Sequence, residues 1–406
     1  MRYRWTILAV GVAAQAALSG VQMGLPALGP ALRDEFNLSL TGVGLVLAAV
    51  SWGIMATLLP WGALADHIGE RTVISTGLGG CAIALVGATL VDGVTLFVLA
   101  LVLSGALGAS AAAASGRSVM GWFGRSERGM ALGVRQMAVP LGGATAALTL
   151  PALVAVGGLQ AALFALAGAC ALGALAAAHW VREPPPAPAG RPRVEAPPPL
   201  RDRRVWRLST GSGLLVCAQV AMVSFVVLFL HDHRGVAAGT AAAGLAAIQI
   251  GGGISRIVVG RWSDRTGRRI VPLRRHGLTM AVGLAAVAAL SNAPLVLLAP
   301  VLLAAGVLTM SWNGLSFTAA AEMAGRERAG TALGLQGTIM RVVSAAAGVA
   351  FGALVSATSW PLAWGVLTAL PLAGWWLLRP LEGEEEGRLR ARAARLAATP
   401  ANLEAA

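Results

Sequence analysis

Two arginines lie deep inside apolar stretches of this sequence, where an ionised side chain needs either a partner or a function. Arg341 lies about eleven residues into one stretch and Arg135 about six into another, so in helices that cross a bilayer they would lie roughly 17 Å and 9 Å deep. No acidic residue lies at comparable depth. The planar guanidinium group suits carboxylate and phosphate. The pattern predicts a cavity that attracts anions, with bonding to backbone carbonyl groups, or extension of Arg135 to the surface, as the alternatives.

Uncharged polar side chains at similar depth are candidates for the same cavity. An amide can hydrogen-bond to a polar solute and an indole can stack on one, but amides also join neighbouring membrane helices. Two of these residues occupy the first apolar stretch of each half of the chain, which favours a shared role. The candidates are Gln15, Gln219, Gln249, Asn313 and Trp312.

A short polar motif occurs twice, as GALADHIGER at 62–71 and GRWSDRTGRR at 260–269. Both copies read Gly-x-x-x-Asp-x-x-Gly followed by charged residues. The glycines allow a tight turn and a close helix approach. The aspartate can cap a helix N-terminus or meet its positive dipole end, and the arginine can pair across the turn. We interpret the motif as a gate, with an ordinary charged turn as the alternative. Its residues are Gly62, Asp66, Gly69 and Arg71 in the first copy, and Gly260, Asp264, Gly267 and Arg268 in the second.

The amino-acid composition indicates which kind of secondary structure must position these residues. The chain of 406 residues is 56% hydrophobic and only 12% charged, whereas soluble proteins are about a quarter charged. The apolar stretches run to roughly 20 residues without polar alternation, which predicts membrane-spanning helices rather than a barrel. Twelve spans are predicted, at residues 6–28, 41–61, 72–91, 94–118, 129–155, 158–180, 208–230, 240–260, 277–292, 294–318, 330–357 and 360–379.

The positive charge is a topology signal. All 31 basic residues are arginine, and the formal net charge is +13. Between the predicted spans only Arg33 and Arg234 fall on the side opposite the two termini, while Arg117 and Arg256 lie within spans close to the terminal side. The positive-inside rule therefore places both termini in the cytoplasm, in a bacterial inner membrane. The charge is explained without nucleic-acid binding.

A proline- and arginine-rich segment divides the chain into two halves. Proline at this density favours extended chain. The predicted organisation is a six-helix bundle over 1–181, a linker over 182–207, a second bundle over 208–380 and a cytoplasmic tail over 381–406. The tail is either a short basic surface helix or disordered.

The halves are parallel repeats. SERGMALG at 126–133 matches RERAGTALG at 326–334 in the equivalent loops, and both copies of the gate motif follow the second span of their half. Over nearly its whole length the chain resembles the major facilitator superfamily, because twelve spans with two copies of that signature loop are typical of it. The resemblance implies two six-helix bundles around a central cavity that opens alternately to each side. It also implies that Asp66 engages the cytoplasmic end of the eleventh span and latches the outward-open state.

Two departures from that family bear on coupling and substrate. Ser104 or a near neighbour stands where proton-coupled members often have an arginine in the fourth span, so that route to proton coupling is in doubt. The drug exporters' glycine–proline motif is matched only weakly by VRQMAVPLGG at 134–143. The HDHR sequence at 231–234 is interpreted as a solvated outer loop.

The sequence thus predicts a monomeric secondary transporter of a small organic or inorganic anion, coupled to a proton or other ion gradient. The alternative is an exporter of drugs or lipophilic metabolites, and a distant one is a membrane sensor that transports nothing. No nucleotide-binding loop, metal-ligand cluster or nucleophile–base pair is legible, so no enzyme activity, cofactor or metal is expected.

Overall fold

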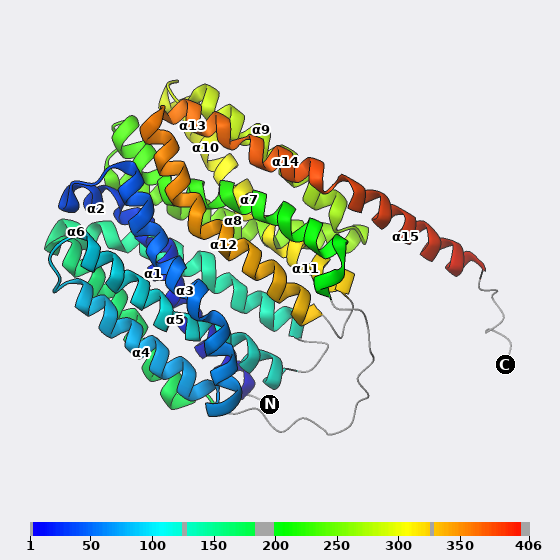
Figure 1. Cartoon of the computed structure of the whole chain (residues 1–406), viewed down its shortest axis with the longest axis horizontal. Helices are drawn as coiled ribbons and strands as arrows, with labels where there is room; N and C mark the ends of the chain where they lie inside the picture. The colour runs from blue at the N-terminus through cyan, green and yellow to red at the C-terminus, as the bar shows by residue number, and fades with distance from the viewer. Residues whose placement is uncertain (1–2, 124–127, 183–198, 325–328, 399–406) are drawn as a thin grey trace.

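The structure, a computed structural model, describes residues 3–123, 128–182, 199–324 and 329–398. Every regular element in these ranges is helical (Figure 1). The first half contains α1 (Tyr3–Gly24), η1 (Leu25–Leu28), α2 (Gly29–Phe36), α3 (Leu40–Ile68), α4 (Glu70–Ala88), α5 (Val94–Trp122) and α6 (Arg128–Trp180). The second half contains η2 (Pro199–Arg201), α7 (Arg203–Leu228), η3 (Phe229–His233), α8 (Ala238–Thr266), α9 (Ile270–Leu290), α10 (Leu295–Met310), α11 (Asn313–Ala324), α12 (Ala329–Ala357), α13 (Trp360–Leu367), α14 (Ala369–Leu377) and α15 (Arg379–Ala398).

Each of the twelve predicted spans has a helical counterpart, although only ten helical stretches of the described residues are long and apolar enough to cross a membrane. The long helix α6 covers the fifth and sixth predicted spans. Gly157 and Gly158 have non-helical dihedrals and mark the boundary between these two spans. Gly158 has φ +67°, which is accessible to glycine and strained for other residues. The ninth predicted span corresponds to α9, whose first turns carry Arg274 and Arg275 and so lower its hydropathy.

Small residues bring the helices of each half together. In the first half α3 packs along α5, and a methyl group added to Gly53 would lie 1.9 Å from the carbonyl oxygen of Val102. The reciprocal contact is equally close, since a methyl group on Gly105 would lie 2.0 Å from the carbonyl oxygen of Val50. In lipid, where apolar burial gives little drive, such close backbone approach is a main source of helix association.

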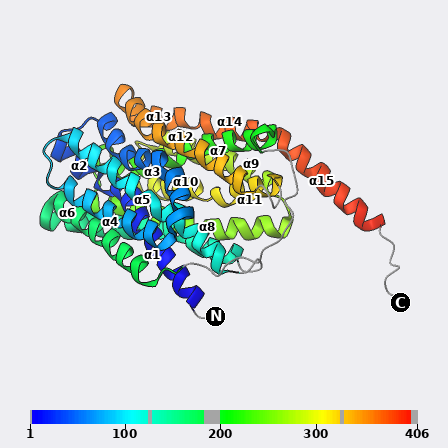
Figure 2. The same ribbon diagram turned by 60° about the horizontal axis from the view of Figure 1, so that its bottom comes forward.

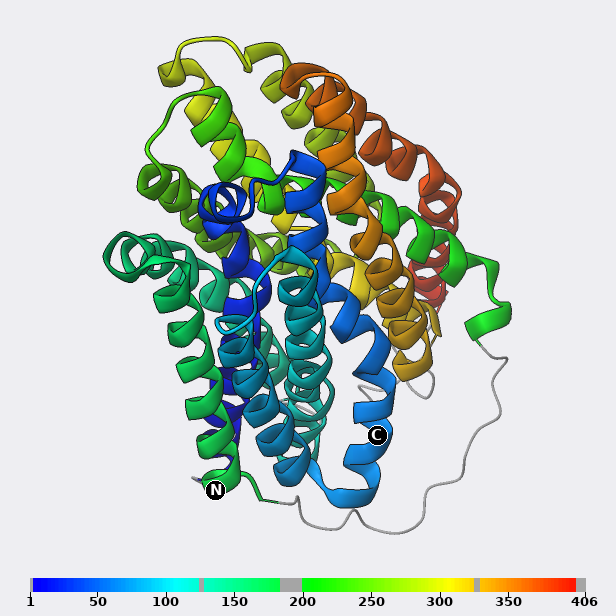
Figure 3. The same ribbon diagram turned by 60° about the vertical axis from the view of Figure 1, so that its left-hand side comes forward.

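The two halves meet through equivalent helices. The second span of each half packs on the fifth span of the other: α3 contacts α12, and α8 contacts α6. Figure 2 and Figure 3 show the two bundles side by side, with α12 of the second half next to α3 of the first. This reciprocal contact is what two parallel repeats related by a pseudo-twofold axis produce.

The tail continues as a helix. After α14 the chain forms α15, which is helical to Ala398 and extends away from the bundle beyond its first turns (Figure 1). The beginning of α15 is anchored, with Leu381 fully buried and Glu385 7% exposed. Of the two states expected for the tail, the described part adopts the helix.

Candidate functional site

The two ends of the molecule carry different elements and are called the near side and the far side. The near side carries the α3–α4 and α8–α9 turns, at Gly69 and Gly267, together with the start of α15. The far side carries α2 and η3.

The far side is tightly closed between the halves. A methyl group on Gly44 of α3 would lie 2.7 Å from the carbonyl oxygen of Gly348 of α12, and one on Gly352 would lie 2.5 Å from the carbonyl oxygen of Leu40. At this end the α3 and α12 backbones are therefore in direct contact.

Polar contacts reinforce this closure. Arg33 of α2 forms an ion pair with Asp232 of η3, and Thr41 donates to the Ser356 hydroxyl at 3.4 Å. Nearer mid-depth the indole Nε1 of Trp52 donates to the carbonyl oxygen of Ala345 at 2.8 Å. All of these contacts join one half to the other.

On the near side, glycines of α3 and α8 lack such close contacts. A methyl group on Gly62 of α3 or on Gly260 of α8 would meet no described atom within 4 Å. In the described structure, the contact between α3 and α12 is thus made on the far side and is absent at Gly62 on the near side. The arrangement corresponds to a cavity that is sealed from the far side.

A cavity of about 100 Å³ lies between the halves, bounded by α1, η1 and α3 on one side and by α7 and α12 on the other. The described residues that line it carry no ionisable group. They are Gln22, Met23, Pro26, Leu47, Ala48, Ser51, Val216, Gln219, Val220, Val223, Ser224, Ser344 and Gly348. Gln219, one of the predicted site residues, is therefore a lining residue.

Arg341 lies one helical turn from this cavity, towards the near side. It precedes Ser344 and Gly348 by three and seven residues on α12, which places all three on one helix face. The side chain is neither fully buried nor fully exposed. Among the described residues it has no hydrogen-bond or ion-pair partner. Arg341 is thus an uncompensated cation at the near-side mouth of the cavity.

Arg135 and Gln15 are brought together. Arg135 is 8% exposed and donates from Nη2 to Gln15 Oε1 at 2.9 Å and to the carbonyl oxygen of Ala112 at 3.0 Å. Its Nε donates to Ser115 Oγ at 2.9 Å, and its Nη1 to Gln136 Oε1 at 3.3 Å. All four partners are neutral. The buried charge is hydrogen-bonded but not neutralised by these groups.

The second half contains an equivalent cluster that the sequence reasoning missed. Gln336 stands two residues after an Ala-Leu-Gly sequence, as Arg135 does in the first half. Its Nε2 donates to the hydroxyl groups of Ser316 and of Ser212, the latter at 3.1 Å. The repeated Ala-Leu-Gly sequence could have identified Gln336, because it marks the same position of each repeat.

Arg256 contacts a break in the tenth span. Predicted as one helix over 294–318, this span consists of α10 and α11, separated at Ser311 and Trp312. Arg256 Nε donates to the carbonyl oxygen of Met310, the last residue of α10, at 2.7 Å. Gln219 Nε2 donates to the sulfur of the same methionine at 3.7 Å. Met310 therefore connects a deep cation with the cavity lining.

The other predicted cavity residues do not line this cavity. Trp312 is fully buried and donates to the carbonyl oxygen of Thr309 at 2.9 Å, so it packs inside the second half. Gln249 is fully buried and donates to the carbonyl oxygen of Met23 at 3.3 Å, which joins α8 to α1 across the halves. Asn313 begins α11 and has a buried Oδ1 without a partner in the described structure.

The first copy of the gate motif lies at the α3–α4 turn. Gly69 has φ +83° and forms the link between the helices, as the motif predicts. Arg71 is exposed at the start of α4. The side chains of Asp66 and Arg117 lie outside the part that the structure describes, so the latch expected at Asp66 stays a prediction.

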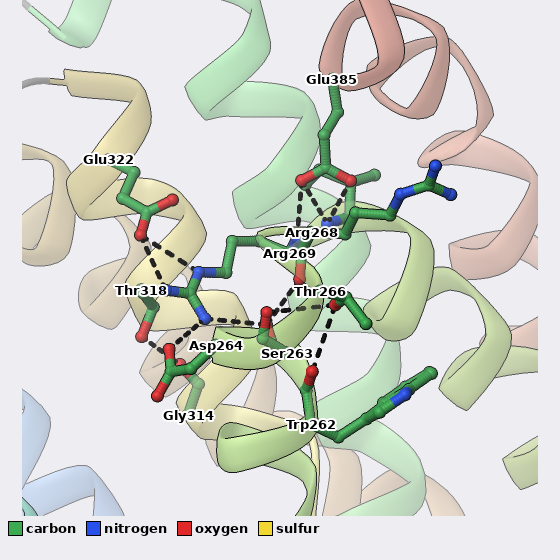
Figure 4. A network of polar contacts seen from close by, with 11 residues as sticks. Trp262, Ser263, Asp264, Thr266, Arg268, Arg269, Gly314, Thr318, Glu322 and Glu385 are labelled. Atoms are coloured by element: carbon green, nitrogen blue, oxygen red, sulfur yellow. Dashed lines mark hydrogen bonds and ion pairs between the residues drawn. The ribbon is translucent and has the colours of Figure 1, made fainter. Parts of the chain in front are cut away.

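The second copy forms an ion-pair network, in which Arg269 rather than Arg268 contacts Asp264 (Figure 4). Arg269 Nη1 lies 2.6 Å from Asp264 Oδ1, and Nη2 lies 3.0 Å from Glu322 Oε1 of α11. Figure 4 shows Arg268 pointing away from this network. Gly267 adopts φ +64° and ends α8, which turns the chain so that Arg269 faces inward. Partial burial alone would lower the pKa of Arg269, but its hydrogen bonds to Asp264 and Glu322, with their charges, outweigh burial and raise that pKa.

The tail helix α15 also contacts the turn between α8 and α9. Glu385 of α15 accepts hydrogen bonds from three successive backbone N–H groups at the start of α9, from Arg269 at 2.6 Å, Ile270 at 3.0 Å and Val271 at 3.2 Å. Glu382 forms an ion pair with Arg274 in the next turn of α9. A carboxylate at a helix N-terminus satisfies orphan donors and the helix dipole.

The HDHR segment has structural partners at the far side. Asp232 pairs with Arg33, His231 Nδ1 lies 2.9 Å from the carbonyl oxygen of Val236, and His233 Nε2 lies 2.9 Å from Asn292 Oδ1. No group of three or more metal-ligating side chains occurs within the described residues.

Two parallel repeats of membrane helices, with a cavity between them that is sealed at one end, define a polytopic membrane transporter fold. Comparison with known proteins gives the family. Residues 10–349 match the family model of the Major Facilitator Superfamily. The chain belongs to this superfamily of transporters, and the predicted family and all-helical membrane fold are confirmed.

Relatives and solved structures agree. An uncharacterised MFS-type transporter of Mycobacterium tuberculosis strain H37Rv is 34% identical over 372 residues, covering 91% of this chain and 83% of the relative. A probable sulfoacetate transporter, SauU, of Cupriavidus necator is 26% identical over 360 residues, covering 81% and 82%. A bacterial homologue of the human lysosomal transporter Spinster, inward-facing and occupied, has a TM-score of 0.75 at 16% identity, covering 96% of this chain and 97% of that one. The nucleoside transporter NupG has a TM-score of 0.70 at 14% identity, covering 92% and 99%.

Proposed function

We propose that this protein is a secondary transporter of a small organic or inorganic anion, which it moves by alternating access. The observation that carries the proposal is the placement of Arg341. It is a cation without a partner among the described residues, one turn below a cavity whose described lining carries no charge. An anion entering from the near side would meet Arg341 first and lose its water shell beside a compensating charge.

Two further arginines within the predicted spans, Arg135 buried and Arg256 half-buried, support the same sign of charge. Arg135 and Arg256 bond to neutral groups in the described structure, so both add positive potential near the interface of the halves. A transporter of cations would need a carboxylate at this depth. The relative named as a probable sulfoacetate transporter is consistent with the proposal, because sulfoacetate is a small organic anion.

The positive-inside rule makes the near side cytoplasmic in this proposal. Most of the arginines that the structure describes lie at that end, whereas Arg33 and Arg234 lie at the far side. The described conformation is then inward-facing, with both termini in the cytoplasm of a bacterial cell and the protein in its inner membrane. We further propose that the protein acts as a monomer and that an ion gradient drives transport.

The segment at 134–143, which weakly matches the drug exporters' motif, has a packing role that supports the anion proposal over the exporter hypothesis. Gly142 lies against α1, where an added methyl group would be 2.3 Å from the carbonyl oxygen of Ala16. Gly143 lies against Gln249 of α8 with similar closeness. Close packing of α6 between α1 and α8 accounts for both glycines.

The test is thermal stability of the detergent-purified protein with sulfoacetate, acetate, phosphate or tetraphenylphosphonium, because a ligand that binds the folded state raises the melting temperature. We expect an anion to stabilise the wild type and to lose this effect in Arg341→Gln. Arg261→Gln is the matched control, because Arg261 is exposed near the end of α8. If only tetraphenylphosphonium stabilises the protein, and Arg341→Gln responds equally, the exporter hypothesis replaces this one.

Ion coupling is tested separately in proteoliposomes that contain the stabilising anion outside. We expect an imposed gradient of protons or sodium to drive accumulation above equilibrium. Uptake that stops at equilibrium under every gradient would contradict the coupling and leave the anion specificity standing.

A further inference from the structure

The side chain of Gln219 faces the cavity from α7. Gln219 is 8% exposed, and its Nε2 donates to the sulfur of Met310 at 3.7 Å. A thioether sulfur accepts hydrogen bonds and cannot donate them. The amide is therefore oriented with its nitrogen towards Met310. Its Oε1 is left buried without a partner in the described structure.

An unpaired buried carbonyl oxygen is costly, and it can be satisfied only by a hydrogen-bond donor. Within the cavity lining, the amide of Gln22 is already used, since its Nε2 donates to Ser51 Oγ at 3.1 Å. The remaining polar lining groups near α7 and α12 are the hydroxyls of Ser224 and Ser344. A bound solute is the natural source of the missing donor.

The position of Gln219 relative to Arg341 indicates where the acid group and the hydrogen-bond donor lie along such a solute. Gly213 of α7 faces Ile339 and Val343 of α12, with an added methyl group 3.6 Å and 3.4 Å from their side chains. This sets Gly213 level with Arg341. The helices α7 and α12 both run from the near to the far side, so Gln219 lies about 9 Å further towards the far side.

From these relationships we propose that the substrate is a small anion that also carries a hydrogen-bond donor, a hydroxyl group, at the end away from its acid group. The acid group pairs with Arg341, and the donor binds Gln219 Oε1. The class is that of short hydroxy-substituted carboxylates and sulfonates. This inference rests on the proposed anion transport and narrows its substrate.

Matched pairs of anions test it on the wild-type protein. Isethionate differs from ethanesulfonate, and 3-hydroxypropionate from propionate, by one hydroxyl group at the end away from the acid group. We expect the hydroxylated member of at least one pair to bind about fivefold more tightly or better, in titrations followed by thermal stability or calorimetry. Equal affinity within both pairs overturns the inference, because water then satisfies Gln219 as well as a solute does.

A variant adds an independent measurement. Gln219→Leu removes the acceptor at similar volume. It should abolish the preference for the hydroxyl group while leaving the affinity for the unsubstituted anion within about twofold. Gln160→Leu is the control, because Gln160 is exposed in α6 and its amide makes only a 3.5 Å contact with the carbonyl oxygen of Thr89.

The outcomes separate this inference from the proposed function. Anions that bind equally well with and without the hydroxyl group, and that need Arg341, leave anion transport intact and refute the donor requirement. Absence of binding by every anion tested, or binding unchanged in Arg341→Gln, refutes the proposed function itself.

Discussion

Arg135 and Gln336 occupy the same position of the two repeats, and each donates a hydrogen bond to a serine of the preceding span. In the first half Arg135 Nε contacts Ser115 Oγ at 2.9 Å, and in the second half Gln336 Nε2 contacts the hydroxyl of Ser316. The hydrogen-bonding role is shared by both halves, but the charge is present in one only. The charge of Arg135 is therefore not needed for that contact, although burying it is costly.

Replacement of Arg135 by the residue of the other half tests what the charge does. Arg135→Gln can keep a hydrogen bond to Ser115 and removes a buried cation, so we expect the melting temperature to stay the same or rise. Anion uptake in proteoliposomes should fall about tenfold or more, through loss of attraction for the substrate. Arg261→Gln should transport like the wild type. Normal uptake by Arg135→Gln would assign Arg135 a structural role only.

The open space beside Gly62 predicts how the near side closes. In the described conformation a side chain at Gly62 meets nothing within 4 Å, so Gly62→Leu should leave the melting temperature within about 2 °C of wild type. If this face of α3 packs against the other half in the alternate state, the leucine blocks closure and uptake falls about tenfold. Gly87→Leu in α4 is the control, because Gly87 also has open space beside it. Wild-type uptake by Gly62→Leu would exclude this face from the gate.

The cap that Glu385 provides predicts that the tail stabilises the second half. Glu385→Ala leaves three N–H groups at the start of α9 without their acceptor, at a cost of about 1–3 kcal/mol. We expect the melting temperature to fall by a few degrees in detergent. Glu386→Ala should have little effect, because the ion pair of Glu386 in the described structure is a partly exposed one, 3.5 Å long, with Arg390 of the same helix. Equal melting of the two variants would show that the tail is not anchored through Glu385.

The Arg33–Asp232 ion pair predicts how firmly the far side is closed. Both side chains are partly exposed, at 39% and 18%, so the pair should contribute only about 0.2–1 kcal/mol to the closed state. Asp232→Asn should therefore raise, about two- to fivefold, the labelling from the far side of a cysteine introduced into the cavity lining by Ser224→Cys. The assay uses an impermeant thiol reagent and a background without Cys81, Cys170 and Cys217.

Reversing the charges provides the check on this interpretation. The double variant Arg33→Asp with Asp232→Arg should return labelling to the level of the parent, whereas Asp92→Asn should not change it. Labelling that stays high in the double variant would mean that Asp232 acts through another contact.

Much of the fold could be predicted because the bilayer imposes it. Twelve apolar stretches, the glycines at the turns and the two copies of the gate motif follow from sequence, since each span must satisfy its own backbone hydrogen bonds in lipid. The break between α10 and α11 at Ser311 and Trp312 was missed, because a stretch of apolar residues reads the same whether its helix is continuous or interrupted.

The candidate site was predictable only in part. The depth of Arg341 and Arg135 is a property of sequence position, and so is the absence of acidic residues at that depth. Which amide meets which arginine depends on rotation about each helix axis, and that is set by contacts such as Gly142 on Ala16. For this reason Gln15 and Gln219, each in the first span of its half, have different environments: one bonds to Arg135, and the other lines the cavity.

The sequence by itself determined the membrane class, the number of predicted spans, the duplication and the sign of the buried charge, because these follow from hydropathy and residue order. Only the tertiary structure decided that the far side is closed, that Arg269 takes the contacts expected of Arg268, and that Glu385 caps α9. These features depend on side chains from segments far apart in the chain. Their distances are fixed by helix packing, which no local sequence pattern encodes, acting together with the turn at Gly267.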